Sequence, residues 1–308
     1  MNWFFIALLA PALWSITNYI DKFLVSKYFK GGGTGALIIF SALIGVFVAP
    51  IFLIISPGIL NIATRDALIL IVSGAIYIVG LLPYLYAMSK DDVSIVVPLF
   101  QLIPVFGYVL GFVFLKEQLT NTQLLGGVMV FIGAIGISLD VPRLVEKQFK
   151  IKWDVLGLMV LSSFLVALYS FLFKFASIEN ESFVVSSFWQ YVGFILVAII
   201  ILVFVKSYRT EFVAIVKRNK LPILGLNASN EIINIIAKIA LDYASLLAPL
   251  ALVWVVNGFQ PLFVFVYGIL ITLLFPKILK ENLSKEVLIQ KIVFIAVIIA
   301  GSVILNLG

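Results

Sequence analysis

A stripe of polar residues inside an otherwise apolar stretch is the feature of this sequence best suited to binding chemistry. Offsets of four, seven and eleven residues return to one face of a helix that turns about 100° per residue. A charge at the centre of a bilayer costs roughly 2.5–3.5 kcal/mol, so this face must meet other helices or water. We predict that it lines a cavity for polar cargo, with Glu231 accepting a proton and Lys238 pairing with a carboxylate; a structural network between helices is the alternative. The stripe contains Asn227, Asn230, Glu231, Asn234 and Lys238.

Aromatic and amide side chains in other apolar stretches are further candidates for the same cavity. Tyr77 and Tyr84 are seven residues apart, which puts both on one helix face. We predict that they line the cavity opposite the polar stripe; ordinary helix packing, with the hydroxyls bonded to backbone, is the alternative. The remaining predicted substrate-binding residues are Trp14, Asn18, Gln101, Tyr169, Asn257 and Gln260.

Prolines interrupt two of the apolar stretches, at corresponding places in the two halves of the chain. A proline inside a helix removes a backbone donor and kinks the helix. The freed carbonyl groups need partners, which a cavity or a neighbouring helix can supply. We predict hinges beside the substrate path, with static kinks as the alternative. The hinge candidates are Pro98, Pro104, Pro249 and Pro261.

Two residue types that carry much enzyme chemistry are missing. The sequence has no cysteine and no histidine, which removes thiolate nucleophiles, soft metal ligands and the commonest general base. We therefore expect no enzyme, no metal site and no cofactor. The net charge of +6 does not indicate nucleic acid, because basic residues normally flank membrane spans on the cytoplasmic side.

The composition indicates that lipid surrounds most of the chain. Hydrophobic residues make up 63% of the 308 and charged residues 12%, against about 45–50% and 25% in soluble domains. Stretches of about 20 apolar residues cross a bilayer as helices. We predict spans over residues 3–24, 34–55, 67–88, 93–115, 122–139, 153–176, 183–205, 220–242, 245–275 and 287–305.

Five predicted spans precede the charged run at 143–152 and five follow it. A unit that crosses the membrane an odd number of times leaves its copy in the opposite orientation, an arrangement that recurs in secondary transporters. We predict an all-α integral membrane protein with ten transmembrane helices in two inverted five-helix repeats. The first repeat covers residues 1–140, a linker covers 141–152, and the second repeat covers 153–308.

Lys and Arg residues gather in the loops that follow the odd-numbered spans, with Arg65, Lys116 and Lys174 as exceptions. Cytoplasmic loops carry an excess of basic residues. We therefore predict a multi-pass protein of the plasma (inner) membrane with both termini outside and the linker 141–152 in the cytoplasm. Lys22 and Lys174 are expected to extend to the two membrane interfaces.

Motifs near the end of the first half resemble a known family. Residues 104–106 (Pro-Val-Phe), 115–120 (Leu-Lys-Glu-Gln-Leu-Thr) and 123–127 (Gln-Leu-Leu-Gly-Gly), with Gly133 and Gly136, are similar to the EamA repeat of the drug/metabolite transporter (DMT) superfamily. In the second half, residues 276–284 depart from the compact turn of that pattern. The resemblance implies two five-helix repeats around a central cavity, and carriage of small metabolites, amino acids or drugs, often outward.

These observations together predict a secondary transporter that works by alternating access between the repeats. One Glu and one Lys in the cavity suit a zwitterion, so we expect the cargo to be a small polar metabolite such as an amino acid. We expect the protein to export it, and protons are the candidate coupling ion. A non-transporting assembly or sensor subunit and an intramembrane enzyme are the alternatives. The sequence leaves open whether the protein is a monomer or a homodimer.

Overall fold

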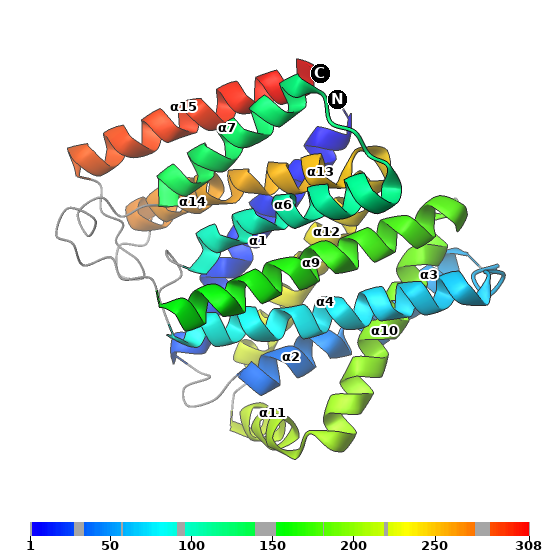
Figure 1. Ribbon diagram of the computed structural model, residues 1–308. Helices are drawn as coiled ribbons and strands as arrows, with labels where there is room; N and C mark the ends of the chain where they lie inside the picture. Colours follow the sequence, from blue (N-terminus) through cyan, green and yellow to red (C-terminus); the bar gives the residue numbers. More distant parts are fainter. Residues whose placement is uncertain are drawn as a thin grey trace.

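The computed structural model describes residues 2–27, 34–56, 58–90, 96–138, 152–180, 182–218, 221–274 and 284–307. Every regular element within these segments is helical (Figure 1). The elements are α1 (Asn2–Lys27), α2 (Thr34–Leu43), α3 (Gly45–Ile55), α4 (Thr64–Lys90), the 3-10 helix η1 (Val97–Gln101), α6 (Leu102–Leu110), the π-helical turn η2 (Gly111–Leu115), α7 (Asn121–Ser138), α9 (Trp153–Asn180), α10 (Phe183–Phe204), α11 (Lys206–Arg218), α12 (Leu221–Leu247), α13 (Leu250–Val256), the 3-10 helix η3 (Asn257–Phe259), α14 (Gln260–Leu274) and α15 (Lys285–Leu307).

Seven helical segments in the described part of the chain are long and apolar enough to cross a membrane. Two shorter apolar helices cover Leu99–Leu115 and Asn121–Ile137. The helix α12 has 27 residues but carries Glu231, Lys238 and Asp242. The prediction of an all-α, multi-pass membrane protein is therefore confirmed. The arrangement of ten spans in two inverted repeats stays a prediction.

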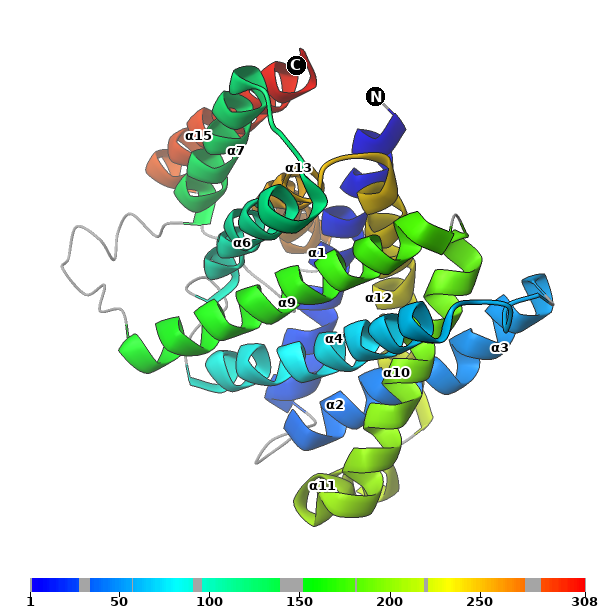
Figure 2. The ribbon, with the colours of Figure 1, turned by 45° about the vertical axis from the view of Figure 1, so that its right-hand side comes forward.

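Helices from the two halves of the chain pack against each other throughout (Figures 1 and 2). α4 runs along α9, α1 runs along α12, and α10 crosses α2, α3 and α4. α7 and α15 form a close pair at one side of the molecule (Figure 2). Gly126 permits this last contact, because a side chain there would collide with the backbone of Gly301 and Leu305. The first and last described residues lie at the same end of the bundle (Figure 1).

The four predicted hinge prolines sit at or near the first residue of a helical element. Pro98 is the second residue of η1, Pro104 the third of α6 and Pro261 the second of α14. Pro249 precedes α13 as its N-cap residue. The first turn of a helix tolerates proline, because its N–H groups have no partner within the helix. Pro104 and Pro261 lie where a 3-10 segment passes into an α-helix, within the longer helical segments Leu99–Leu115 and Leu250–Leu274. The role of the four prolines as hinges stays a prediction.

Two connections that carried predictions lie outside the described residues. They are residues 141–151, which make up nearly all of the predicted linker, and residues 275–283, which contain most of the departure from the EamA pattern. Lys152, directly before α9, donates a hydrogen bond to the carbonyl oxygen of Lys90 at 2.7 Å. Lys90 forms an exposed ion pair of 2.7 Å with Asp154. The ends of α4 and α9 therefore meet beside the linker.

Candidate functional site

A cavity of about 110 Å³ lies between helices of both halves. The first half of the chain contributes α1, α4, η1 and α6 to its wall, and the second half contributes α9, α12, α13, η3 and α14. Drug-sized ligands occupy pockets of roughly 300–1,000 Å³, so this cavity suits a smaller molecule. Most of the predicted substrate-binding residues line it: Trp14, Asn18, Tyr77, Tyr84, Tyr169, Asn234, Asn257 and Gln260.

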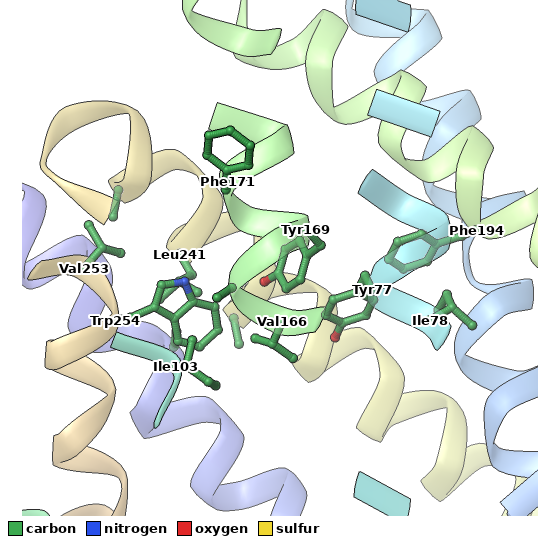
Figure 3. Packing of buried hydrophobic residues seen from close by; sticks show 14 of the residues in the cluster. Tyr77, Ile78, Ile103, Val166, Tyr169, Phe171, Phe194, Leu241, Val253 and Trp254 are labelled. Carbon is green, nitrogen blue, oxygen red and sulfur yellow. The ribbon is translucent and has the colours of Figure 1, made fainter. Parts of the chain in front are cut away.

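Aromatic rings form much of the cavity wall. The indoles of Trp14 and Trp254 stack with their centroids 6.1 Å apart and an interplanar angle of 15°. Tyr169 meets Trp254 edge-on at 6.4 Å and Tyr77 edge-on at 4.9 Å. Figure 3 shows Trp254, Tyr169 and Tyr77 converging on one region together with Ile103 and Val166. Edge-on and stacked contacts of this kind are favourable, and here they join α1, α4, α9 and α13.

Trp254 is a wall residue that was not among the predicted substrate-binding residues. Its indole Nε1 donates a hydrogen bond to the hydroxyl of Ser170 at 3.1 Å, which ties α13 to α9. The polar end of the ring is thereby satisfied inside the protein, and its apolar face remains for the cavity. A pattern search for polar stripes could not have found it, because the residues around Trp254 are uniformly apolar.

Asp21 is the second unpredicted wall residue and the only acidic one among the described residues that line the cavity. The side-chain Nδ2 of Asn230 donates a hydrogen bond to Asp21 Oδ1 at 2.6 Å. Asn230, predicted to bind substrate, is not in the cavity wall and instead hydrogen-bonds to Asp21. The signal was present in the sequence, since Asp21 follows Asn18 and Thr17 by one helical turn.

Lys238 does not reach this cavity as a free charge. Its Nζ donates to Asp242 Oδ2 at 2.5 Å and also to Gln190 Oε1. Five aromatic rings surround the ammonium, with centroids 5.3–5.9 Å away. Gln190 in turn donates to the Ser73 hydroxyl at 3.0 Å, which donates to the carbonyl oxygen of Tyr169 at 2.8 Å. This network joins α12, α10, α4 and α9, which is the structural alternative to the predicted carboxylate-binding role.

Glu231 lies beside a second, smaller cavity of about 10 Å³. Its Oε1 accepts a hydrogen bond from the Ser41 hydroxyl at 2.8 Å. Lys238 borders the same small cavity but is paired with Asp242, not with Glu231. Asn234 lines both cavities. Glu231 therefore lines the small cavity and not the central one, whereas Tyr77 also lines both.

Asn227 and Gln101 are two predicted site residues that line neither of these cavities. Asn227 is buried, and its Oδ1 has no hydrogen-bond partner. Gln101 lines a larger, mostly apolar groove of about 470 Å³ between α6, α7 and α13. The structure does not bring either side chain into the central cavity.

Lys174 is buried rather than extended to a membrane interface, so that expectation was wrong. Its Nζ forms an ion pair of 2.5 Å with Glu117 Oε1 and donates to the carbonyl oxygen of Ala248 at 2.6 Å. Glu117 Oε2 accepts the backbone N–H of Leu250 at 2.8 Å. The Glu of the EamA-like motif therefore fastens α9 to the connection between α12 and α13. The side chain of Lys22 lies outside the described residues.

The fold and the cavity define a helical, multi-pass membrane protein. The sequence model of the EamA-like transporter family matches residues 1–139, which confirms the EamA resemblance and identifies the first half of the chain as an EamA-like transporter sequence. That family is one of membrane transporters.

Two individual proteins resemble this chain. An uncharacterized protein of Methanocaldococcus jannaschii is 40% identical over 83 residues, which cover 26% of this chain and 61% of that relative. A crystal structure of another protein aligns with 99% of this chain and 96% of its own chain, with a TM-score of 0.66 and 13% sequence identity. At that identity the likeness shows a shared fold, and it extends over both halves.

Proposed function

We propose that the protein is a secondary transporter of the DMT type, which moves a small polar metabolite through the central cavity by alternating access. The observation that carries the proposal is the cavity itself: a space with polar and aromatic walls, built jointly by helices of both halves. Transporter sites lie in this way between repeats near the bilayer midplane. The EamA-like match over residues 1–139 supports the same conclusion.

The proposed topology is ten spans in two inverted repeats, residues 1–140 and 153–308, joined by the linker 141–152. A two-fold relation between the repeats would exchange α1 with α9 and α4 with α12. It would therefore turn the α4–α9 contact into the α12–α1 contact, and both are extensive. The α7–α15 and α6–α13 contacts would map onto themselves. This pairing pattern supports the internal symmetry.

α12 is the proposed eighth span despite its charges. Its charged side chains are buried within the protein, so lipid does not meet them. The opposite face presents Ile232, Ile236 and Tyr243, which are 54%, 51% and 42% exposed. An apolar outer face with ionisable groups turned inward is the arrangement expected of a functional membrane helix.

The proposed orientation places the end of the bundle that carries α11 in the cytoplasm and both termini outside. α11 is a helix with Lys and Arg in its last turn and no buried residue. It is held to the ends of α4 and α2 by a hydrogen bond of 2.7 Å between the hydroxyls of Tyr86 and Tyr208, and by one of 3.1 Å from the Gly35 N–H to Glu211. Cytoplasmic surfaces of plasma-membrane proteins are enriched in such basic residues.

Proton coupling and outward transport are part of the proposal. Glu231 supports coupling, because it is a buried carboxyl group whose partner in the structure is a neutral hydroxyl, that of Ser41. The case for an amino acid is weaker than the sequence suggested. It rested on a Glu–Lys pair facing the cargo, and Lys238 is engaged by Asp242.

The test is uptake by purified protein in proteoliposomes, across a panel of labelled cationic, neutral, zwitterionic and anionic metabolites, with and without a pH gradient. We expect saturable uptake of at least one class above that of protein-free vesicles. Folded protein that moves none of them would refute the proposal and favour an assembly or sensor subunit. Conversion of a panel compound to a product would favour an enzyme.

A further inference from the structure

We infer that the central cavity selects a small organic cation, an amine or quaternary ammonium compound with an apolar or aromatic body, and that Asp21 is its counter-charge. The inference rests on the proposed transport function only for the steps after binding. It is carried by three features of the cavity wall: its charge, its aromatic rings, and its unpartnered polar atoms.

The charge of the wall has one sign. Asp21 is the one ionisable acid among the described residues that line the cavity, and no Lys or Arg is among them. Asn230 satisfies one of its oxygens, Oδ1, with a neutral donor. The nearby buried cation, Lys238, already has Asp242 as its ion-pair partner. Asp21 is half-buried. A carboxylate that is partly removed from water and has no cation beside it is unfavourable, and a positively charged cargo would supply the missing charge.

The aromatic rings provide the second feature. A cation is attracted to the face of a Trp, Tyr or Phe ring within about 6 Å of the centroid, and cages of such rings recognise ammonium groups. The wall contains Trp14, Trp254, Tyr77, Tyr84, Tyr169 and Phe100. Tyr77 and Tyr169 already take part in such an arrangement, because the Lys238 ammonium lies 5.3 and 5.4 Å from their centroids.

Unpartnered polar atoms are the third feature. Asn257 is 5% exposed and lines the cavity, and its Oδ1 accepts no hydrogen bond. A buried acceptor of this kind needs a donor, and the N–H of an ammonium group is one. Asn18 offers an unpartnered Nδ2 donor, which fits a hydroxyl or carbonyl group elsewhere on the cargo.

The same wall disfavours a cargo that bears a carboxylate. In a space of about 110 Å³, a second carboxylate would lie close to Asp21. No described cation in the wall is there to neutralise it. Zwitterions and anions are therefore expected to bind more weakly than a cation of the same shape.

The test is calorimetric titration of the purified, full-length protein with probes that share one ring. They are phenethylamine, phenylalanine and 3-phenylpropionate, with tetramethylammonium as a ring-free cation. We expect phenethylamine to bind at least tenfold more tightly than phenylalanine, and phenylpropionate to bind least. Equal or tighter binding of phenylalanine or phenylpropionate would overturn the inference, as would failure of both cations to bind.

Variants assign the effect to Asp21. Asp21→Asn should weaken phenethylamine binding at least tenfold, whereas Asp21→Glu should retain part of it. Asp154→Asn is the matched control: it removes a carboxylate from an exposed pair with Lys90 and should bind like the wild type. Wild-type affinity in Asp21→Asn would overturn the inference. If that variant fails to fold, the selectivity of the wild type and the affinity of Asp21→Glu decide.

These experiments distinguish a failure of the cation inference from a failure of the transporter proposal. Cation binding without flux in proteoliposomes would refute the transporter and leave the inference intact. Flux of anions or zwitterions in preference to amines would keep the transporter and refute the inference.

Discussion

Substituting Asp242 by Leu should destabilise the protein strongly, because it leaves the buried Lys238 ammonium without its counter-charge. The side chains of Lys238 and Asp242 are 2% and 4% exposed and lie 2.5 Å apart. Removing one partner of a buried pair costs about 3–5 kcal/mol. We therefore expect a decrease of about that size in the free energy of unfolding, measured by titrating the detergent-solubilised protein with SDS.

The double variant Lys238→Met/Asp242→Leu separates the ion pair from its surroundings. It removes both charges. The remaining loss of stability comes from Gln190 Oε1, which accepts a hydrogen bond from the Lys238 ammonium in the wild type and has no donor in the double variant. An unsatisfied buried acceptor costs about 1–3 kcal/mol, so the double variant should be about 2 kcal/mol more stable than Asp242→Leu. A replacement of the exposed partner of Lys90, Asp154→Asn, serves as the control and should change stability little.

Two results would refute this reasoning. The first is an Asp242→Leu variant as stable as the wild type. The second is a double variant that folds well and has lost cargo binding, because Lys238 would then act on the cargo rather than join helices.

Four further predictions come from named contacts. Glu117→Gln should lower the free energy of unfolding by about 3–5 kcal/mol, since it removes the counter-charge of buried Lys174; SDS titration measures it. Trp254→Ala should cost about 3–5 kcal/mol and weaken cargo binding in calorimetry, because it removes the ring stacked on the other cavity indole. Gly126→Leu should lower the yield of monodisperse protein in gel filtration, because the helix pair α7–α15 leaves no room for a side chain. Glu231→Gln should abolish uptake driven by a pH gradient at normal membrane abundance, while exchange of cargo without a gradient persists; wild-type gradient-driven uptake would contradict a coupling role.

The sequence predicted helices best where local composition alone decides them. The span expected at 183–205 is α10, Phe183–Phe204. It begins where the Ser182 hydroxyl accepts the Val185 N–H at 3.4 Å, a cap that local sequence can encode. The span expected to end at residue 242 instead continues to Leu247. A charged residue such as Asp242 suggests the end of a membrane span, but here Asp242 is buried in an ion pair with Lys238. The sequence pattern does not show such contacts inside the fold.

The sequence predicted only part of the site, because it does not show which helices contact one another. Asn234, which the spacing of the stripe put on the predicted cavity face, lines both cavities. The stripe alone did not reveal that Lys238 pairs with Asp242, although a separation of four residues on a helix permits it. Asp21 and Trp254 enter the wall only because α1 packs along α12 and meets α13. Contacts of that kind join residues more than 200 positions apart, and no local pattern records them.

Access to the cavity from each side of the membrane tests the central claim most directly. The chain has no native cysteine, so a single cysteine at Thr17, a cavity-lining residue, can be followed with a membrane-impermeant thiol reagent in oriented vesicles. Alternating access predicts labelling from either face, slowed by bound cargo. Labelling from one face alone, or from neither in protein shown to be folded, would contradict it.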